Sequence, residues 1–330
     1  MFASGPFAAI DLDRQIDAFG RAGERFFDGL AEIGWGWLAA ALVLSLGLQL
    51  CRARAWTNAL EAAYPADRVS RRGVTGAFLV GAGMNGVLPA RGGDAIKIVL
   101  AKRSVRDSSY PAIISSFAVL APFDALAGFL VLGYAINQGL LPELPRLPEL
   151  PAFDISFWAA HPYLLLWTLV AFSIGSVVLV AFIARRAEAV WQRLKQGVAI
   201  LREPRRYLHE VAAWQLAAWL LRFASFWLFL EAFGIGGSAE TVLLVMSVLA
   251  ISGALPLTPG GAGAQQALLV ATLEGPTRVA VLAYSVGQQV AVTAWSVAIA
   301  FITLGIIFRT GDWRALVREG RKARGEPAAP

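Results

Sequence analysis

The segments GVLPARGGDAIK (86–97) and GALPLTPGGAGAQQ (253–266) decide the fold of this chain. Each reads Gly-x-Leu-Pro, continues for two or three residues, and then gives Gly-Gly before a run that suits a helix. Proline removes a backbone donor and breaks a straight helix. We therefore expect the chain to turn at both places rather than to continue through one long helix.

The composition around these segments is that of a membrane protein. Of 330 residues, 57% are hydrophobic and 16% are charged, whereas soluble domains carry about 25% charged residues. The single Cys51 excludes an internal disulfide framework, and two histidines argue against a His/Cys metal site. The sequence has no P-loop ATPase signature. The net charge of +6 fits basic loops that face anionic lipid better than a nucleic-acid partner, and no cofactor or metal is expected.

Apolar stretches of about 20 residues mark the helices that cross a membrane. Five stretches qualify, at roughly 35–51, 110–136, 163–184, 211–233 and 279–308. Two others, 74–88 and 241–273, are shorter or are cut by proline and glycine.

The basic residues predict the orientation of these spans. Four blocks hold 22 of the 29 Lys and Arg residues, at 52–73, 97–106, 185–206 and 309–324. The positive-inside rule places all four blocks, and with them the C-terminus, on the cytoplasmic side of a multi-pass cell-membrane protein. The stretch 74–96 must then leave and return on the inner side, and 241–278 must do so on the outer side. Such re-entrant backbone survives only when it is buried in protein or lines a wet cavity.

These two hairpins predict an inverted-topology repeat. Halves of about 35–136 and 211–308 each contain a span, a broken hairpin and a second span, and the 163–184 span and the basic 185–206 helix join them. Paired interrupted segments of this kind point to a transporter's binding site; the alternative is chance recurrence of Gly-Gly and Leu-Pro. The predicted fold class is all-α, a polytopic integral membrane protein with two re-entrant or broken helical hairpins. The predicted domains are an N-terminal amphipathic segment, a transmembrane domain and a basic cytoplasmic tail, at 1–34, 35–308 and 309–330.

The first hairpin carries the residues that suit an anion. Pro89 and a pair of glycines would open the helix and free backbone amides, which attract anions at a helix N-terminus. Arg91 adds a guanidinium fork that matches phosphate, so a lipid phosphate is a plausible guest; the alternative is a helix cap with an arginine that snorkels to the interface. The candidate binding residues are Asn85, Pro89, Arg91, Gly92, Gly93, Asp94 and Lys97.

The second hairpin is polar but carries no charge of its own. Its glycines would let the backbone approach a ligand, or they would serve tight helix packing. The candidate binding residues are Thr258, Pro259, Gly260, Gly261, Gly263, Gln265 and Gln266.

Three ionisable residues fall within the predicted spans, where charges are expensive and are functional candidates. Asp124 would carry a proton or pair with the hairpin arginine. Arg222 would need a counter-charge or a cavity. Glu231, near the outer end, would reach water. No Ser/His/Asp set is assembled at plausible places, so catalysis is not expected.

At these residues the chain resembles the flippase-like transmembrane region of lysylphosphatidylglycerol synthase and its stand-alone relatives. The resemblance rests on Asn85 with LPARGGDAIK (88–97), on Asp124 and on PLTPGGAGAQQALL (256–269), in the family's order over roughly 35–308. Asp94 and Lys97 replace the family's Glu and Arg and keep the charge. The family's Glu and Arg at 266 and 121 are Gln266 and Ala121 here, so this chain lacks those two charges.

The resemblance implies lipid movement or lipid-glycan handling rather than lysine transfer, because no soluble aminoacyl-transfer domain follows. We predict a lipid flippase or scramblase whose substrate is an anionic phospholipid or a polyprenyl-phosphate-linked glycan. Arg91 and Lys97 would hold the phosphate, and Asp94 and Asp124 would balance charge or carry protons. The alternatives are a secondary transporter of a soluble metabolite, and a non-catalytic membrane partner of a lipid- or glycan-modifying enzyme.

Overall fold

The computed structural model describes residues 33–88, 92–137, 188–254, 264–273 and 276–308, together with single positions between 167 and 178. Every regular element in this part of the chain is a helix. Four helices are long and apolar enough to cross a membrane, namely Trp35–Ala63, Tyr110–Tyr134, Pro204–Ala232 and Arg278–Phe308. The chain is therefore an all-α polytopic membrane protein, as predicted. The predicted N-terminal segment up to residue 32, most of the 163–184 span and the tail from 309 lie outside the described residues.

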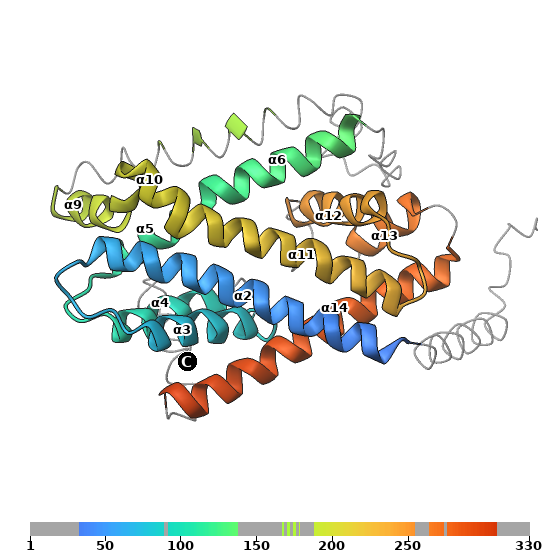
Figure 1. The fold of residues 1–330 in the computed structure, drawn as a ribbon, viewed down its shortest axis with the longest axis horizontal. Coiled ribbons are helices and arrows are strands. Elements are labelled where there is room, and N and C mark those ends of the chain that lie inside the picture. Colours follow the sequence, from blue (N-terminus) through green and yellow to red (C-terminus); the bar gives the residue numbers. More distant parts are fainter. Residues whose placement is uncertain are drawn as a thin grey trace, which may run out of the picture.

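Two long helices, α2 (Trp35–Ala63) and α11 (Ala213–Ala232), form the centre of the bundle and run antiparallel side by side (Figure 1). Hydrogen bonds tie them at both ends. The Gly34 amide donates to the Ala232 carbonyl at 2.9 Å, and the Asn58 side chain donates to the Glu210 carbonyl at 2.6 Å. Small buried residues along α2 let the two backbones come close, which is how helices associate in membranes.

Helix α2 is longer than the predicted span of 35–51. It continues to Ala63 because the added residues are mostly good helix formers, and the first proline comes only at Pro65. Arg52, which the sequence placed in a basic loop, consequently lies within the helix.

The first short helix pair is a hairpin whose two ends lie together. It consists of α3 (Arg71–Met84) and α4 (Gly92–Ser104). Val69 and Val105 form an isolated antiparallel bridge, and the Ser70 amide donates to the Ser104 carbonyl at 3.0 Å. At about 1.5 Å per residue each helix is roughly 20 Å long, which is less than the hydrocarbon core of about 30 Å. The hairpin therefore leaves and returns at the same end of the bundle, as predicted.

Glycines let α3 fit between α4 and the last long helix, α14 (Arg278–Thr303). A Cβ on Gly83 would overlap the carbonyl oxygen of Ser296 in α14. A Cβ on Gly81 would lie 2.6 Å from the Cβ of Lys97 in α4. The backbones on both sides of α3 are therefore closer than any larger residue permits.

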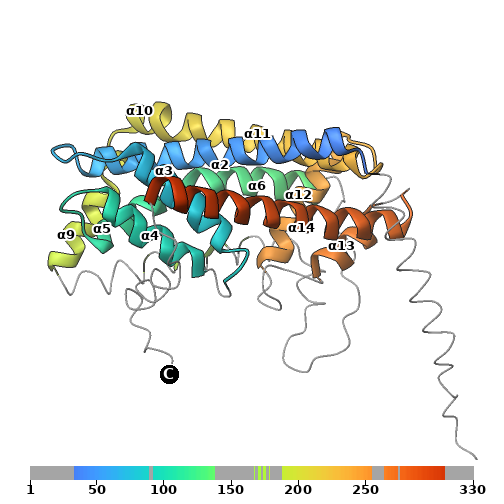
Figure 2. The same ribbon diagram turned by 90° about the horizontal axis from the view of Figure 1, so that it is seen from below.

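The second short pair, α12 (Ala239–Ala254) and α13 (Ala264–Thr272), lies at the opposite end, beside the end of α11 and the start of α14 (Figure 1). The turn between these two helices, 255–263, lies outside the described residues. Seen from the side, α2 and α11 cover one face of the bundle, and α4 and α13 lie toward the other (Figure 2).

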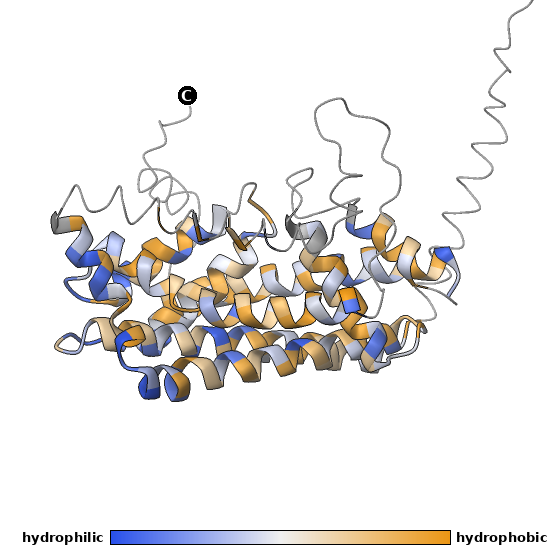
Figure 3. Ribbon diagram, turned by 90° about the horizontal axis from the view of Figure 1, so that it is seen from above, coloured by the Kyte–Doolittle hydropathy of each residue, from blue (hydrophilic) through white to orange (hydrophobic). Residues whose placement is uncertain are grey.

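The hydrophilic residues gather at one end of the bundle (Figure 3). This end carries the start of α3, the end of α4 and the short helices α9 (Glu188–Gly197) and α10 (Pro204–Tyr207). We call it the basic end, because Arg68, Arg71, Arg72, Arg103 and Arg205 belong to these segments. The helix α5 (Tyr110–Ala118) starts there and leads into α6 (Ala121–Asn137).

Candidate functional site

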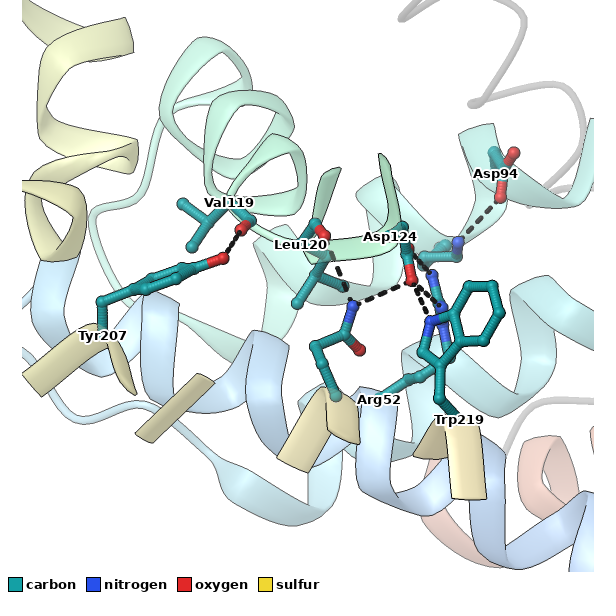
Figure 4. Close-up of polar contacts among 9 residues, drawn as sticks. Arg52, Asp94, Val119, Leu120, Asp124, Tyr207 and Trp219 are labelled. Carbon is teal, nitrogen blue, oxygen red and sulfur yellow. Dashed lines mark hydrogen bonds and ion pairs between the residues drawn. The ribbon is translucent and has the colours of Figure 1, made fainter. Parts of the chain in front are cut away.

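Asp124 is the centre of a polar cluster that three helices build within the spans (Figure 4). It lies in the first turn of α6. Arg52 of α2 donates to both of its oxygens, from Nη1 to Oδ1 at 2.9 Å and from Nη2 to Oδ2 at 2.7 Å. This is the two-point geometry that favours arginine over lysine in carboxylate pairs.

Helix α11 adds two more donors to the same carboxylate. Gln215 Nε2 lies 3.2 Å and Trp219 Nε1 lies 3.0 Å from Oδ1. Residues four apart share a helix face, so the two side chains reach Asp124 together. An indole N–H and a guanidinium donate only, and a carboxylate that accepts from all these groups is the ionised form. Asp124 is thus engaged as a counter-ion.

The pairing differs from the one predicted. Asp124 pairs with an arginine, which was one of two alternatives, but the partner is Arg52 of α2. The hairpin residue Arg91 lies outside the described residues.

Arg222 adds a second cation to the cluster. It follows Trp219 by one turn, and its Cζ lies 5.0 Å from the centre of that ring. Both Arg52 and Asp124 are close enough to act on it electrostatically. Within the described part of the chain, Arg222 makes no ion pair of its own. Two guanidinium groups thus share one carboxylate, which leaves the cluster one positive charge in excess at a depth where uncompensated charge is costly.

The first hairpin holds a separate ion pair. Lys97 is buried, and its Nζ lies 2.7 Å from Asp94 Oδ1. The same ammonium lies 4.1 Å from the ring centre of Phe117 and 4.9 Å from that of Phe78. Asn85 Nδ2 also donates to Asp94 Oδ1, at 3.2 Å. A carboxylate and two aromatic faces therefore already compensate the Lys97 charge.

The ion pair and the Asp124 cluster are linked through α2 and α5. Trp56 lies one turn beyond Arg52 on α2, and its indole donates to Ser116 Oγ at 3.0 Å. The Trp56 ring packs edge-on against Phe117, with ring centres 5.6 Å apart. The Phe117 ring also contacts the Lys97 ammonium. The charged groups of the hairpin and of the long helices thus belong to one connected region.

The glycines at the start of α4 serve helix packing. A Cβ on Gly93 would overlap the Gly81 carbonyl oxygen and lie 2.7 Å from Asn85 Oδ1. Gly92 is buried as well. Of the remaining candidates, Pro89, Arg91, Thr258, Pro259, Gly260, Gly261 and Gly263 lie outside the described residues.

The described residues of the second hairpin tie it to α14. Gln266 Nε2 donates to Gln289 Oε1 at 3.1 Å, and Gln265 is buried. Glu231, expected to reach water, accepts the Gly237 amide at 2.9 Å and so closes the turn after α11. In the described part of the chain, no group of three His, Cys, Asp or Glu residues could hold a metal ion.

Sequence reasoning missed Arg52, Gln215 and Trp219. Arg52 was counted with a basic loop, because its carboxylate partner is 72 residues away. The sequence did contain a signal for Gln215 and Trp219. Gln215, Trp219 and Arg222 follow the i, i+4, i+7 spacing that marks one helix face, and a polar stripe in an apolar span needs partners.

The family model described as "Lysylphosphatidylglycerol synthase TM region" matches residues 20–291. The matched range contains the whole Asp124 cluster and the Asp94–Lys97 pair. No curated protein and no solved structure matches the chain significantly.

Proposed function

Because this chain belongs to the lysylphosphatidylglycerol synthase TM region family, we propose that it is a flippase- or scramblase-like protein that moves a phosphate-bearing lipid headgroup across the cell membrane. The substrate class is an anionic phospholipid or a polyprenyl-phosphate-linked glycan. The basic end of the bundle faces the cytoplasm in this proposal, in keeping with the positive-inside rule.

The observation that carries the proposal is the excess positive charge of the Asp124 cluster. A phosphodiester has one negative charge, and taking it through hydrocarbon without a partner is prohibitively costly. Arg222 has no counter-ion among the described residues, and its planar fork matches two phosphate oxygens. A headgroup that meets Arg222 would bring the charge of the cluster to zero.

The other charges have supporting roles in this proposal. Asp124 holds Arg52 in place through two hydrogen bonds, so that the cluster keeps its shape when no lipid is bound. In this proposal the phosphate meets the cluster at Arg222, while the acyl chains stay in the bilayer. The sequence has no P-loop signature, and in this proposal the movement is passive or coupled to an ion gradient, unless a partner supplies ATP hydrolysis.

The test is transbilayer movement in reconstituted vesicles. Purified protein is placed in liposomes with a fluorescent anionic phospholipid, and dithionite quenches the label from outside. We expect quenching beyond half of the signal for the wild type and a rate at least about tenfold lower for Arg222→Gln, the effect of losing one charge-assisted hydrogen bond. Arg205→Gln is the matched control, because this arginine is exposed at the basic end and outside the cluster.

Two results would count against the proposal. Equal rates for Arg222→Gln and wild type would remove the cluster from the path. Protein-free rates for the wild type, with both an anionic phospholipid and a labelled polyprenyl-phosphate lipid, would exclude lipid translocation and favour a soluble substrate or a partner-subunit role.

A further inference from the structure

A polar cavity lies at the basic end, apart from the Asp124 cluster. Its volume is about 420 Å³, within the range of small-molecule sites. It lies where the end of α2, the connection from α4 to α5, and α9 meet. Its walls carry four charged side chains, Asp67, Lys102, Asp107 and Arg193.

None of the four forms an ion pair with a described residue, although the Lys102 ammonium lies over the Tyr110 ring. Elsewhere at the basic end opposite charges pair off. Arg71 Nε lies 2.6 Å from Glu61, and Arg206 Nε lies 3.0 Å from Glu210. A cavity that presents two carboxylates and two cations separately is complementary to a guest that has charges of both signs.

One wall suits a phosphate. Helix α5 begins at Tyr110, and its N-cap residue Ser109 makes no side-chain cap bond. Ser109 lines the cavity, while its Oγ is buried behind that wall and has no partner among the described residues. The Ser109 amide donates to Tyr64 Oη at 3.1 Å, which fixes this corner. Lys102 Nζ stands 5.1 Å from the Tyr110 ring centre, beside the positive end of the helix.

The acidic groups of the cavity suit an ammonium group. Asp107 has a left-handed backbone with φ of 52°, which turns the chain between α4 and α5. Asp67 comes from the connection after α2. Lys102 and Arg193 supply positive charge to the same cavity, so a guest with an ammonium group alone would leave them uncompensated.

We propose that this cavity binds a group that joins a phosphate to a primary ammonium, as in a phosphoethanolamine headgroup. Lys102, Arg193 and the start of α5 take the phosphate, and Asp67 and Asp107 take the ammonium. The guest is either the headgroup of a membrane lipid or its water-soluble glycerophospho form. The proposal requires binding only, so it stands or falls independently of transbilayer movement.

Calorimetry on the full-length protein in a phosphate-free maltoside detergent tests the chemistry. The probes are glycerophosphoethanolamine, glycerol 3-phosphate and ethanolamine. We expect glycerophosphoethanolamine to bind most tightly. Arg193→Gln should weaken it about five- to tenfold, and Asp107→Asn should remove its advantage over glycerol 3-phosphate, since each change deletes one charged partner. Asparagine tolerates the left-handed backbone, and Arg193 is exposed, so both variants should fold; thermal unfolding checks this.

Native mass spectrometry distinguishes the two sources of the guest. If the source is a lipid, delipidated protein should retain added phosphatidylethanolamine over phosphatidylglycerol, and Arg193→Gln should lose that preference while Arg205→Gln keeps it. If the source is the soluble compound, calorimetry should show glycerophosphoethanolamine binding and its loss in the variants, while native mass spectrometry should show no preference for phosphatidylethanolamine. Binding that both variants leave unchanged, equal affinity for glycerol 3-phosphate and glycerophosphoethanolamine, or no binding in either assay would overturn the proposal.

Discussion

Replacing Asp124 with asparagine should destabilise the protein strongly, because two arginines depend on its charge. The Arg52 and Asp124 side chains are only 17% and 29% exposed. Removing one partner of a buried pair costs about 3–5 kcal/mol, and the partial exposure of this pair favours the lower figure. The asparagine amide group would also place donors against the donors of Arg52, Gln215 or Trp219.

Thermal unfolding in detergent measures this cost. A loss of about 3 kcal/mol corresponds to a midpoint lower by roughly 4–5 °C, because a chain of 330 residues unfolds with an entropy of about 0.7 kcal/mol/K. Glu231→Gln is the control, because Glu231 accepts one backbone amide and should shift the midpoint far less.

A double-mutant cycle separates the ion pair from general damage. Arg52→Gln combined with Asp124→Asn should be less destabilised than the sum of the single variants, by about 1–3 kcal/mol, the range for residues in direct contact. An unchanged midpoint in Asp124→Asn, or strict additivity in the double variant, would refute the reasoning about the cluster.

Three further predictions concern the first hairpin. Val69→Cys with Val105→Cys, in a background without the native cysteine, should form a disulfide on mild oxidation, because facing bridge residues have Cα atoms about 4.5–5.5 Å apart. If mass spectrometry detects no disulfide after oxidation, the closed hairpin is contradicted. Gly83→Ala should cost about 1–3 kcal/mol in thermal unfolding through overlap with α14, whereas Gly128→Ala, where a Cβ meets nothing within 4 Å, should be neutral or slightly stabilising. Lys97→Met should lower stability by about 1–3 kcal/mol, because its carboxylate partner loses a charged donor in a half-buried site; an unchanged midpoint would show that the pair contributes nothing.

The sequence predicted those features of the fold that depend on local chemistry. Proline and paired glycines interrupt a helix wherever they occur, so the segment 86–97 indicated a turn without knowledge of its neighbours. Apolar length indicated the spans. The predicted end of the first span, residue 51, falls short of the end of α2. The change in polarity at Arg52 was taken as the end of the span, although helix propensity continues to Ala63.

The site was less predictable, because its contacts join distant segments. Asp124 and Arg222 were recognisable as charges in apolar spans. The partner Arg52 was not, since an arginine near the end of a span reads equally well as an interfacial residue. Similarly, Lys97 was expected to hold phosphate, whereas Phe78, Phe117 and Asp94 surround it. The two aromatic faces come from different helices, α3 and α5, and leave no mark in a linear sequence.

The donors around Asp124 also set an order of assembly during synthesis. Arg52 leaves the ribosome before Asp124, but Gln215 follows Asp124 by 91 residues. At about 5–20 residues per second this interval is roughly 5–18 s. For that time the carboxylate has its arginine but neither donor of α11, and the face of α2 that α11 later covers is open. The insertion of α11 completes the site and covers α2 in one event, so a nascent chain stalled before residue 204 should expose a polar patch that membrane quality control can recognise.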